Sequence, residues 1–458
     1  MGHSQSLILI QMSEGEAIMS PPSLYTTDNC ETNTMSTYIA HGGKDAIITT
    51  KEKRALLQEA LLKLGGVPKK ILVIPPDITR LHSNAGELTR ILYELWDTAN
   101  GTTFDILPAI GTHAPMTDAQ IAEMYGDLPK ATYHVHHWRT GLYHFGEVPS
   151  EFIREVSGGK LDYSIPVAVN RRLVEGNYEL IISVGQVIPH EVIGIANGFK
   201  NVFVGAGGVE MINKSHFLGA VDGMERLMGR TDTSVRRVLN YAHTHFLKQL
   251  GIVYVMSVMD VDIDGNRVMR GLYIGDDART FETAAELSRN VNMTFLDEPL
   301  AKVVVYLDPR EFKSTWLGNK AIYRTRMAMA DDGELIIIAP GLREFGEDAE
   351  IDRLIRKYGY RGTPATLKAV EENSELQENL SAAAHLIHGS TEGRFKVVYA
   401  TEHLTQTEIE SVGYQWASLG EVIAKYNPET LVDGFNDGFF YISEPGQGLW
   451  ALRSRFSK

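Results

Sequence analysis

The sequence contains a single cysteine, Cys30, among its 458 residues. One thiol excludes an intrachain disulfide and any metal cluster built from cysteines, as is usual in a reducing compartment. No apolar run approaches the twenty or so residues that a membrane-spanning helix requires. The apolar run at residues 7–10 is too short for a signal peptide. We therefore expect a cytoplasmic protein.

Positive charge is also scarce, because 44 basic residues face 58 acidic ones and the formal net charge is −14. Non-specific binding to nucleic acids or anionic membranes requires a positive surface, so we expect neither as a partner. A local basic pocket for a small anion remains compatible with this balance. We expect a small-molecule ligand, with a homo-oligomer as a possible assembly.

The chain is too long for one ordinary hydrophobic core, and its hydrophobic content of 43% is that of a globular protein. Apolar runs typical of buried strands alternate with amphipathic helical patterns, which predicts an α/β fold with mainly parallel sheets. We predict a flexible leader at residues 1–45, an α/β domain at 46–297 and a second α/β domain at 298–458. The cleft between the two domains is the expected ligand site.

Local patterns give more specific expectations. They predict helices at 51–64, around 88–96 and at 235–250, a capping box opening a helix at residue 117, and a hairpin that turns at Asp264-Gly265. Strands are predicted at 70–74, 104–107, 133–138, 180–184 and 201–205, and from residue 303 strands and helices alternate again. The histidines of 133–138 are expected to have a surface or interface role.

The stretch from 183 to 216 holds the densest set of chemically useful residues. His190 follows the strand at 180–184, and Lys200 and His216 follow at intervals of ten and sixteen residues. A histidine exchanges protons near pH 7, and a lysine in an apolar loop is able to act as a nucleophile or covalent anchor. Gly207 and Gly208 precede a predicted helix, where backbone N–H groups bind phosphate. Their spacing does not match a dinucleotide fingerprint.

Two further clusters follow predicted strands. Asp77 and Arg80 come directly after Pro75-Pro76, and an arginine at this position could bind a carboxylate or phosphate. The plainer interpretation is that Asp77 caps a helix and Arg80 is solvated. His113 follows the strand at 104–107 and, taken alone, is more often structural than catalytic. In the second domain, Lys320 and Arg324 lie four positions apart after Trp316, a spacing that presents positive charge on one helix face.

Taken together, the order and spacing of Asp77, Arg80, His113, His190, Lys200, His216 and Lys320 resemble the pattern of the nickel-dependent lactate racemase family, over residues 50–440. The resemblance implies two α/β domains with the active site between them. It also implies a nickel pincer nucleotide, a pyridinium mononucleotide that binds Ni through two sulfur atoms and a ring carbon. Separate cofactor-synthesis enzymes make this cofactor.

By this resemblance, Lys200 binds the cofactor covalently and His216 is the protein ligand to nickel. Asp77 and Arg80 lie beside the cofactor, and His113 and His190 are the acid/base pair. Gly207 and Gly208, whose backbone N–H groups precede the predicted helix, are the residues expected at the cofactor's phosphate. Arg80, Lys320 and Trp316 contact the substrate. The reaction implied is inversion of a 2-hydroxy acid through removal and return of the Cα hydride, with a histidine for each face.

One departure concerns the substrate. Lactate-specific enzymes carry a polar amide where this chain has Leu317, so a more apolar pocket and a substrate other than lactate are expected, sugar acids included. Two alternatives stay open: a non-catalytic protein that binds a nucleotide or hydroxy acid, and a nicotinamide-dependent 2-hydroxy acid dehydrogenase. The dehydrogenase would need a glycine fingerprint after its first strand, where this chain has Pro75-Pro76.

Overall fold

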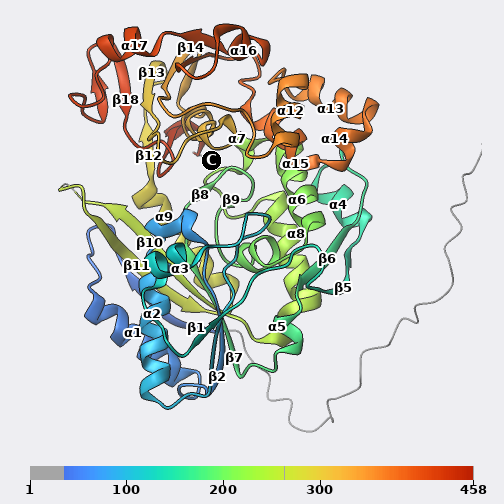
Figure 1. The fold of residues 1–458 in the computed structure, drawn as a ribbon, viewed down its shortest axis with the longest axis vertical. Helices are drawn as coiled ribbons and strands as arrows, with labels where there is room; N and C mark the ends of the chain where they lie inside the picture. The colour runs from blue at the N-terminus through green and yellow to red at the C-terminus, as the bar shows by residue number, and fades with distance from the viewer. Residues whose placement is uncertain (1–35, 263, 457–458) are drawn as a thin grey trace, which may run out of the picture. The chain divides into compact units, whose positions relative to one another are not determined.

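A seven-stranded sheet organises the first part of the chain in a computed structural model that describes residues 36–262 and 264–456 (Figure 1). Its strand order is β1 (Thr37–Gly42), β11 (Arg267–Gly275), β10 (Val253–Val261), β7 (Leu180–Gln186), β2 (Lys70–Ile74), β3 (Thr103–Ile106) and β4 (Ala131–Tyr133). The strands from β10 to β4 are parallel, and β11 and β1 add an antiparallel edge. We call residues 36–296 the first lobe.

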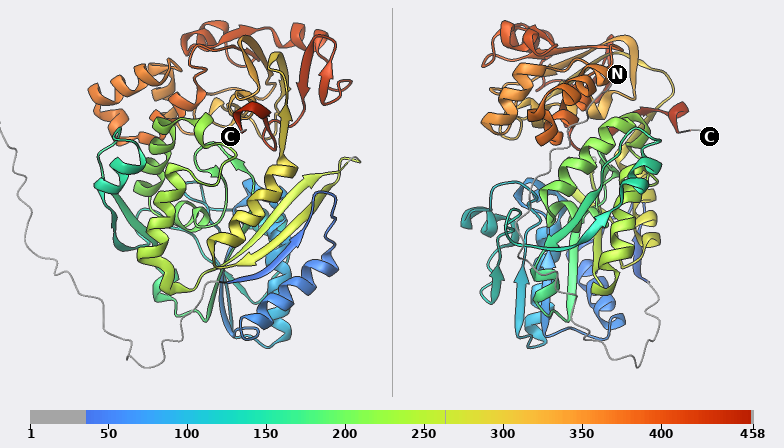
Figure 2. Two further views of the ribbon diagram at one scale, coloured as in Figure 1. Left: turned by 180° about the vertical axis from the view of Figure 1, so that it is seen from behind. Right: turned by 90° about the vertical axis from the view of Figure 1, so that its right-hand side faces the viewer.

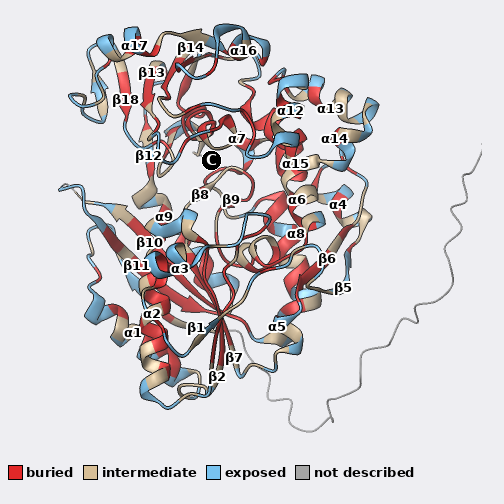
Figure 3. Ribbon diagram, viewed as in Figure 1, coloured by how far each residue is buried: buried red, intermediate tan, exposed pale blue. Residues whose placement is uncertain are grey.

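Consecutive residues of a strand point to opposite sides of the sheet, and in β2 consecutive residues are apolar and buried. Helices therefore cover both faces of this sheet. Ile71 and Val73 pack with α1 (Thr50–Lys63) and α2 (Ala85–Thr98). Leu72 and Ile74 belong to the core on the other side, with α6 (Val209–Asp222), α8 (Ser234–Ala242) and α9 (Ala278–Asn292). Figure 3 shows the sheet buried between these layers.

Shorter elements complete the first lobe. They are α3 (Asp118–Tyr125), β5 (Leu142–Val148), α4 (Ser150–Val156), β6 (Ile165–Asn170), α5 (Arg172–Glu175), β8 (Pro189–His190), β9 (Gly194–Ile195), α7 (Met224–Leu227) and β12 (Met293–Leu296). Two 3-10 helices, η1 (Ile78–Ser83) and η4 (Lys248–Leu250), and two π-helical turns, η2 (Asn201–Gly205) and η3 (His243–Leu247), are also present.

A six-stranded sheet forms the second lobe, residues 300–442. Its order is β16 (Gln415–Ala417), β15 (Lys396–Ala400), β14 (Met329–Ile338), β13 (Leu300–Tyr306), β18 (Phe439–Ile442) and β17 (Gly434–Asn436), parallel except for β17. Its helices are α10 (Thr315–Gly318), α11 (Lys320–Thr325), α12 (Ala349–Tyr358), α13 (Thr363–Glu372), α14 (Ser374–Glu378), α15 (Leu380–Gly389), α16 (Gln406–Ser411) and α17 (Leu419–Lys425). The predicted α/β class with mainly parallel sheets is confirmed.

The two lobes are joined by shared packing and by a returning strand. Beyond the second sheet the chain forms β19 (Leu449–Leu452), which pairs in parallel with β12, and then η5 (Arg453–Arg455). Helix α15 packs on α6, where Ser381 Oγ donates to Asn213 Oδ1 at 2.6 Å (Figures 1 and 2). One apolar core runs through both lobes. Our division at residue 297 stays a prediction.

Most local expectations are confirmed, including β2, β7, α1, α2, the capping box of Thr117 with Gln120 and the β10–β11 hairpin. The predicted leader at 1–45 is wrong from Thr37 onward, because β1 pairs with β11 at the edge of the large sheet. This pairing joins segments more than two hundred residues apart, which local periodicity does not reveal. Residues 1–35 lie outside the described residues.

The predicted strand at 133–138 is also wrong, since β4 ends at Tyr133. His136 is buried, its Nε2 lies 2.9 Å from the carbonyl oxygen of Gly207, and its Nδ1 lies 3.1 Å from Nδ2 of Asn170. A surface role for His136 is therefore excluded. No helix in the described part of the chain is long and apolar enough to cross a bilayer.

Candidate active site

A cleft of about 770 Å³, its open mouth included, is lined by residues of both lobes. The first lobe contributes loops that follow β2 and β7, where the carboxyl ends of parallel strands usually carry the chemistry of α/β proteins. The second lobe contributes α11, and the segment that returns to β19 contributes two residues. The lining is Pro76, Arg80, His82, Ser83, Gly185, Gln186, Ile188, His190, Glu191, Ala196, Asn197, Lys200, Asn201, Lys320, Arg324, Gly446 and Gln447.

Asp77 follows β2 and caps η1. Its Oδ1 accepts hydrogen bonds from the Thr79 backbone N–H at 3.1 Å and hydroxyl at 2.5 Å, and its Oδ2 lies 2.6 Å from Nδ1 of His113. Burial works to raise the pKa of Asp77, but these bonds and the charges of His113 and Arg80 outweigh it and lower the pKa. An ionised Asp77 assigns the ring proton of His113 to Nδ1 and leaves Nε2 as an acceptor.

His190 lies at the turn of the β8–β9 hairpin. Its Nδ1 accepts a hydrogen bond from the Val192 backbone N–H at 3.1 Å, so the neutral ring carries its proton on Nε2. Burial lowers the pKa of His190 well below its ordinary value, against the opposing charge of Glu191, and the nearby cation Lys200 adds to the effect. The two histidines therefore hold their ring protons differently: the contact with Asp77 places a proton on Nδ1 of His113, whereas the hydrogen bond from Val192 leaves the proton of His190 on Nε2.

Lys200 stands immediately before η2, in a segment fixed to the sheet by its neighbour. Asn201 Nδ2 donates to the carbonyl of Ile74 at 3.0 Å and to Ser183 Oγ at 2.9 Å, which ties the segment to β2 and β7. Burial and the charge of Arg80 lower the pKa of Lys200 to about 8. Within the described residues Lys200 makes no ion pair, so its amine is free to react.

The segment 201–205 is a π-helical turn, and our prediction of a strand is wrong here. Its sequence, Asn-Val-Phe-Val-Gly, has the β-branched and aromatic residues typical of strands. No edge is open to it, because β7 already has β10 and β2 as neighbours. The segment instead buries Val202 and Phe203 beneath the carboxyl ends of the strands.

His216 lies on α6, half-buried on the side of Lys200. Its Nδ1–H donates to the carbonyl of Ile212 at 2.6 Å, one turn earlier, and this bond leaves Nε2 free. Burial and the charge of Lys200 lower the pKa of His216 to about 4, so the ring is neutral at pH 7. A neutral imidazole whose other nitrogen donates to a carbonyl is the usual form of a metal-binding histidine.

Helix α11 of the second lobe brings two cations to the cleft. Burial and the charge of Arg80 lower the pKa of Lys320 to about 8, and its Nζ lies 3.7 Å from Glu311. Arg324 is 4% exposed and reaches the first lobe, where it donates to the carbonyl of Pro189 and lies 3.6 Å from Glu191 Oε2. The cleft is thus cationic and suited to an anionic ligand.

The structure brings Arg80, His190, Lys200 and Lys320 to one cleft, with Asp77–His113 and His216 beside it. It does not bring in three other predicted residues. Trp316 packs on His385, with ring centroids 4.5 Å apart. Gly207 accepts from His136, and Gly208 precedes α6, so neither lines the cleft.

Sequence reasoning missed two titratable residues of the cleft, His82 and Glu191. Burial and the charge of Arg80 lower the pKa of His82 to about 3, so it stays neutral. Burial works to raise the pKa of the Glu191 carboxyl, but its interactions with His190 and Arg324 outweigh this effect and lower the pKa. The position of Glu191 directly after His190 was the available signal. Within the described residues no group of three or more histidine, cysteine or acidic side chains is arranged to hold a metal ion.

Residues 24–228 match the sequence model of a family described as the lactate racemase N-terminal domain. A protein from Thermotoga maritima has a similar crystal structure, with 24% identity and a TM-score of 0.78 over 90% of this chain and all of that one. The lactate racemase apoprotein from Thermoanaerobacterium thermosaccharolyticum is 17% identical, with a TM-score of 0.67 over 90% of this chain and 94% of that one. At these identities the likeness concerns the fold.

No curated protein matches the chain by sequence. The family match covers the segment that carries Asp77, His113, His190, Lys200 and His216, and the fold match extends over both lobes. The resemblance to the lactate racemase family is therefore confirmed: residues 24–228 match the model of its N-terminal domain, and the fold is similar to that of a lactate racemase apoprotein.

Proposed function

We propose that the protein is a racemase or epimerase that inverts the hydroxyl-bearing carbon of a 2-hydroxy acid. The observation that supports this most directly is the meeting of His190 and Lys200 from one lobe with Lys320 from the other in a single cleft. The chemistry needs a proton carrier, an anchoring amine and a cation for the carboxylate, and these residues supply one of each.

The cofactor we propose is the nickel pincer nucleotide, covalently bound through Lys200. The donor set fits this group, because Lys200 has a lowered pKa and no ion pair among the described residues, and His216 presents a free Nε2. Arg80 would lie beside the cofactor, with its charge available to the phosphate or to the substrate. When bound, this cofactor supplies the acceptor and donor for the Cα hydride.

The histidines would move the hydroxyl proton. His113 accepts it at Nε2, and Asp77 stabilises the imidazolium that forms. His190 in its present tautomer donates a hydrogen bond from Nε2 to the substrate oxygen. To accept a proton there it must shift its own proton to Nδ1, which ends the hydrogen bond from Val192. The two faces of the planar 2-keto acid would thus be served by histidines with different resting states.

The cationic and amide side chains of the cleft would position the substrate. Lys320 and Arg80 are both available to a carboxylate, since among the described residues Arg80 makes no ion pair and Lys320 makes only a long one, 3.7 Å from Glu311. The walls also carry Gln186, Asn197 and Gln447, whose amides suit a hydroxylated substrate. We therefore place polyhydroxylated 2-hydroxy acids among the substrates to be screened.

The test is co-expression with cofactor-synthesis enzymes, followed by intact-mass spectrometry, nickel analysis and chiral chromatography with a panel of 2-hydroxy acids. We expect one adduct and about one nickel per chain, both absent from Lys200→Ala, and interconversion of one panel member. An adduct without interconversion across the panel would favour a binding protein. The absence of an adduct under loading conditions would overturn the cofactor assignment.

A further inference from the structure

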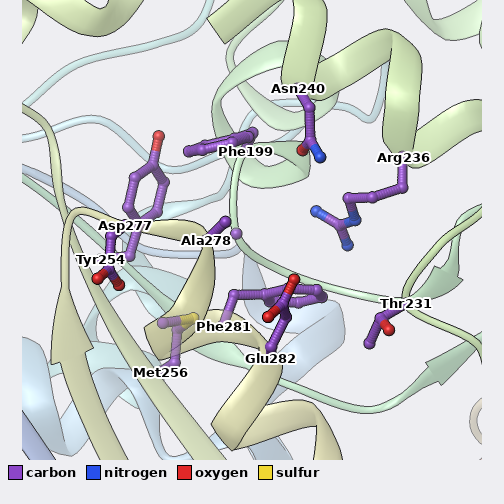
Figure 4. Close-up of a pocket in the computed structure, with 11 residues that line it drawn as sticks. Phe199, Thr231, Arg236, Asn240, Tyr254, Met256, Asp277, Ala278, Phe281 and Glu282 are labelled. Carbon is purple, nitrogen blue, oxygen red and sulfur yellow. The ribbon is translucent and has the colours of Figure 1, made fainter. Parts of the chain in front are cut away.

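A second cavity, of about 410 Å³ with its mouth included, is lined by Phe199, the residue directly before Lys200 in the chain (Figure 4). It is built by the segment around Phe199, α8, β10 and the start of α9, and it shares no lining residue with the active-site cleft. Its lining is Gly198, Phe199, Thr231, Arg236, Asn240, Tyr254, Met256, Asp277, Ala278, Phe281 and Glu282. The proposed reaction uses none of these side chains.

Arg236 supplies the charge at the inner end of this cavity. It is 4% exposed, and its guanidinium points into the space between Phe199 and Phe281 (Figure 4). Two of its N–H groups donate, to the carbonyls of Asn197 at 3.0 Å and Ile195 at 2.6 Å, and its Nε has no hydrogen-bond partner. Among the described residues no carboxylate pairs with it. A buried arginine without an acid is costly, and an anionic ligand would relieve that cost.

Apolar side chains form the walls, and acidic ones stand at the mouth. Phe199, Met256 and Phe281 offer aromatic and thioether surface, and the Arg236 guanidinium lies 4.0 Å from the Phe281 ring centroid. Asp277 caps α9 by accepting from the Thr280 backbone N–H at 2.7 Å. Glu282 is exposed and makes no ion pair within the described residues, so its charge is available to a ligand at the mouth.

We propose that this cavity binds a small zwitterion with an apolar body, of the class of apolar α-amino acids. The carboxylate would accept hydrogen bonds from Arg236, the ammonium would face Glu282, and the side chain would lie against Phe281 and Met256. A plain anion would meet the repulsion of Glu282 and a plain cation that of Arg236. A zwitterion satisfies both.

Binding here would act on the segment that holds Lys200. Arg236 is tied to the carbonyls of Ile195 and Asn197, and Gly198 and Phe199 line the cavity itself. A ligand that fixes Arg236 would restrain this segment and the amine that follows it. The cavity is therefore a candidate regulatory site for whatever reaction occurs at Lys200.

Calorimetric titration of the cofactor-free full chain tests the site independently of any racemase activity. The probes are L-leucine, L-methionine and L-phenylalanine, with 4-methylpentanoate and 3-methylbutylamine as analogues of leucine that lack the ammonium or the carboxylate. We expect at least one amino acid to bind, and both analogues of leucine to bind about tenfold or more weakly than leucine, as the loss of a charged hydrogen bond implies. No binding by the three amino acids would overturn the proposal.

Variants locate the binding. Ala278→Trp fills the mouth from an exposed position and should abolish binding, and Arg279→Trp, one residue along and also exposed, is the matched control that should preserve it. Glu282→Gln should weaken leucine without weakening 4-methylpentanoate. If Ala278→Trp and Arg279→Trp bind leucine with equal affinity, the proposed site is overturned. If the unaltered protein binds leucine and 4-methylpentanoate with equal affinity, the role of Glu282 is overturned.

Discussion

The Nδ1 atom of His113 lies 2.6 Å from Oδ2 of Asp77, a residue 36 positions earlier in the chain. This contact orients the imidazole and directs the Nε2 lone pair away from the carboxylate, because an ionised Asp77 retains the proton on Nδ1. It turns a partly exposed histidine into an oriented base. Four experiments follow from this and other contacts of the structure.

Asp77→Asn keeps the shape of the side chain but removes the charge that stabilises an imidazolium. We expect the rate of interconversion to fall about 100-fold, within the range for loss of a positioned acid or base. Initial rates by chiral chromatography measure this, with nickel and adduct content as controls for loading. A rate within twofold of the unaltered enzyme, at equal loading, would remove His113 from the mechanism.

The amine of Lys200 should react at a lower pH than an ordinary lysine. Burial and Arg80 lower its pKa to about 8, so the neutral amine is already abundant near pH 8, whereas an ordinary lysine needs a pH near 10.4. Modification of Lys200 by an amine-directed reagent, followed by peptide mass spectrometry against pH, should give a midpoint near 8. A midpoint above 10 would show that the amine is solvated and not poised to react.

His216→Ala separates metal binding from covalent attachment. Lys200 is untouched by this change, so the mass adduct should persist after loading, while the bound nickel should fall well below one per chain. Combined intact-mass and metal analysis measures both quantities. Nickel retained at the level of the unaltered protein would exclude His216 as the ligand.

Glu225 on α7 is the common partner of three arginines beyond the first lobe. Its carboxylate lies 3.2 Å from Arg326 Nε and 2.9 Å from Arg394 Nη1, and it also contacts Arg455. Glu225→Gln leaves Arg326 and Arg455 without an acidic partner among the described residues, while Arg394 keeps Asp331 at 2.9 Å. We expect a loss of about 1–3 kcal/mol in the free energy of unfolding, below the full value for a buried network because the carboxylate is partly exposed.

Urea denaturation tests this prediction, with Asp297→Asn at an exposed ion pair as the control that should change little. The pH dependence has a defined sign. Burial of Glu225 is outweighed by the charges of the arginines, which lower its pKa in the folded state below the ordinary value. The stabilisation is therefore complete at neutral pH and is lost as the pH falls below about 4. Equal stability of the two variants at pH 7 would contradict the prediction.

Much of this fold was predictable because its elements are locally encoded. Buried strands such as β2 and β7, and helices with an apolar face such as α2, follow from residue periodicity alone. The edge strand β1 and the π-helical turn at 201–205 could not be predicted from local sequence. The strand depends on a distant partner, and the turn depends on the lack of a free sheet edge. Both are decided by tertiary structure.

The residues of the candidate site also fall into those that the sequence could predict and those that depend on tertiary structure. Asp77, His113, His190, Lys200 and His216 were identified from their order and spacing, and all five lie in the segment that matches the family model. Glu191 was not, because its role in the cleft depends on Arg324, whose helix packs against the β8–β9 hairpin from 135 residues away. Trp316 illustrates the converse: a position matched by order alone is occupied in packing on His385.

The pairing of β12 with β19 means that the chain crosses between the lobes twice, at 297–299 and at 443–448. Because the two strands are parallel, the first crossing leaves after Leu296 and the second enters before Leu449, at opposite ends of the ribbon, so any turn of one lobe against the other would have to pass through both crossings. The second crossing also contains Gly446 and Gln447, which form part of the cleft wall. Any turn of the lobes would therefore reshape the cleft wall at this crossing, and substitutions there should alter KM as well as the rate of closure.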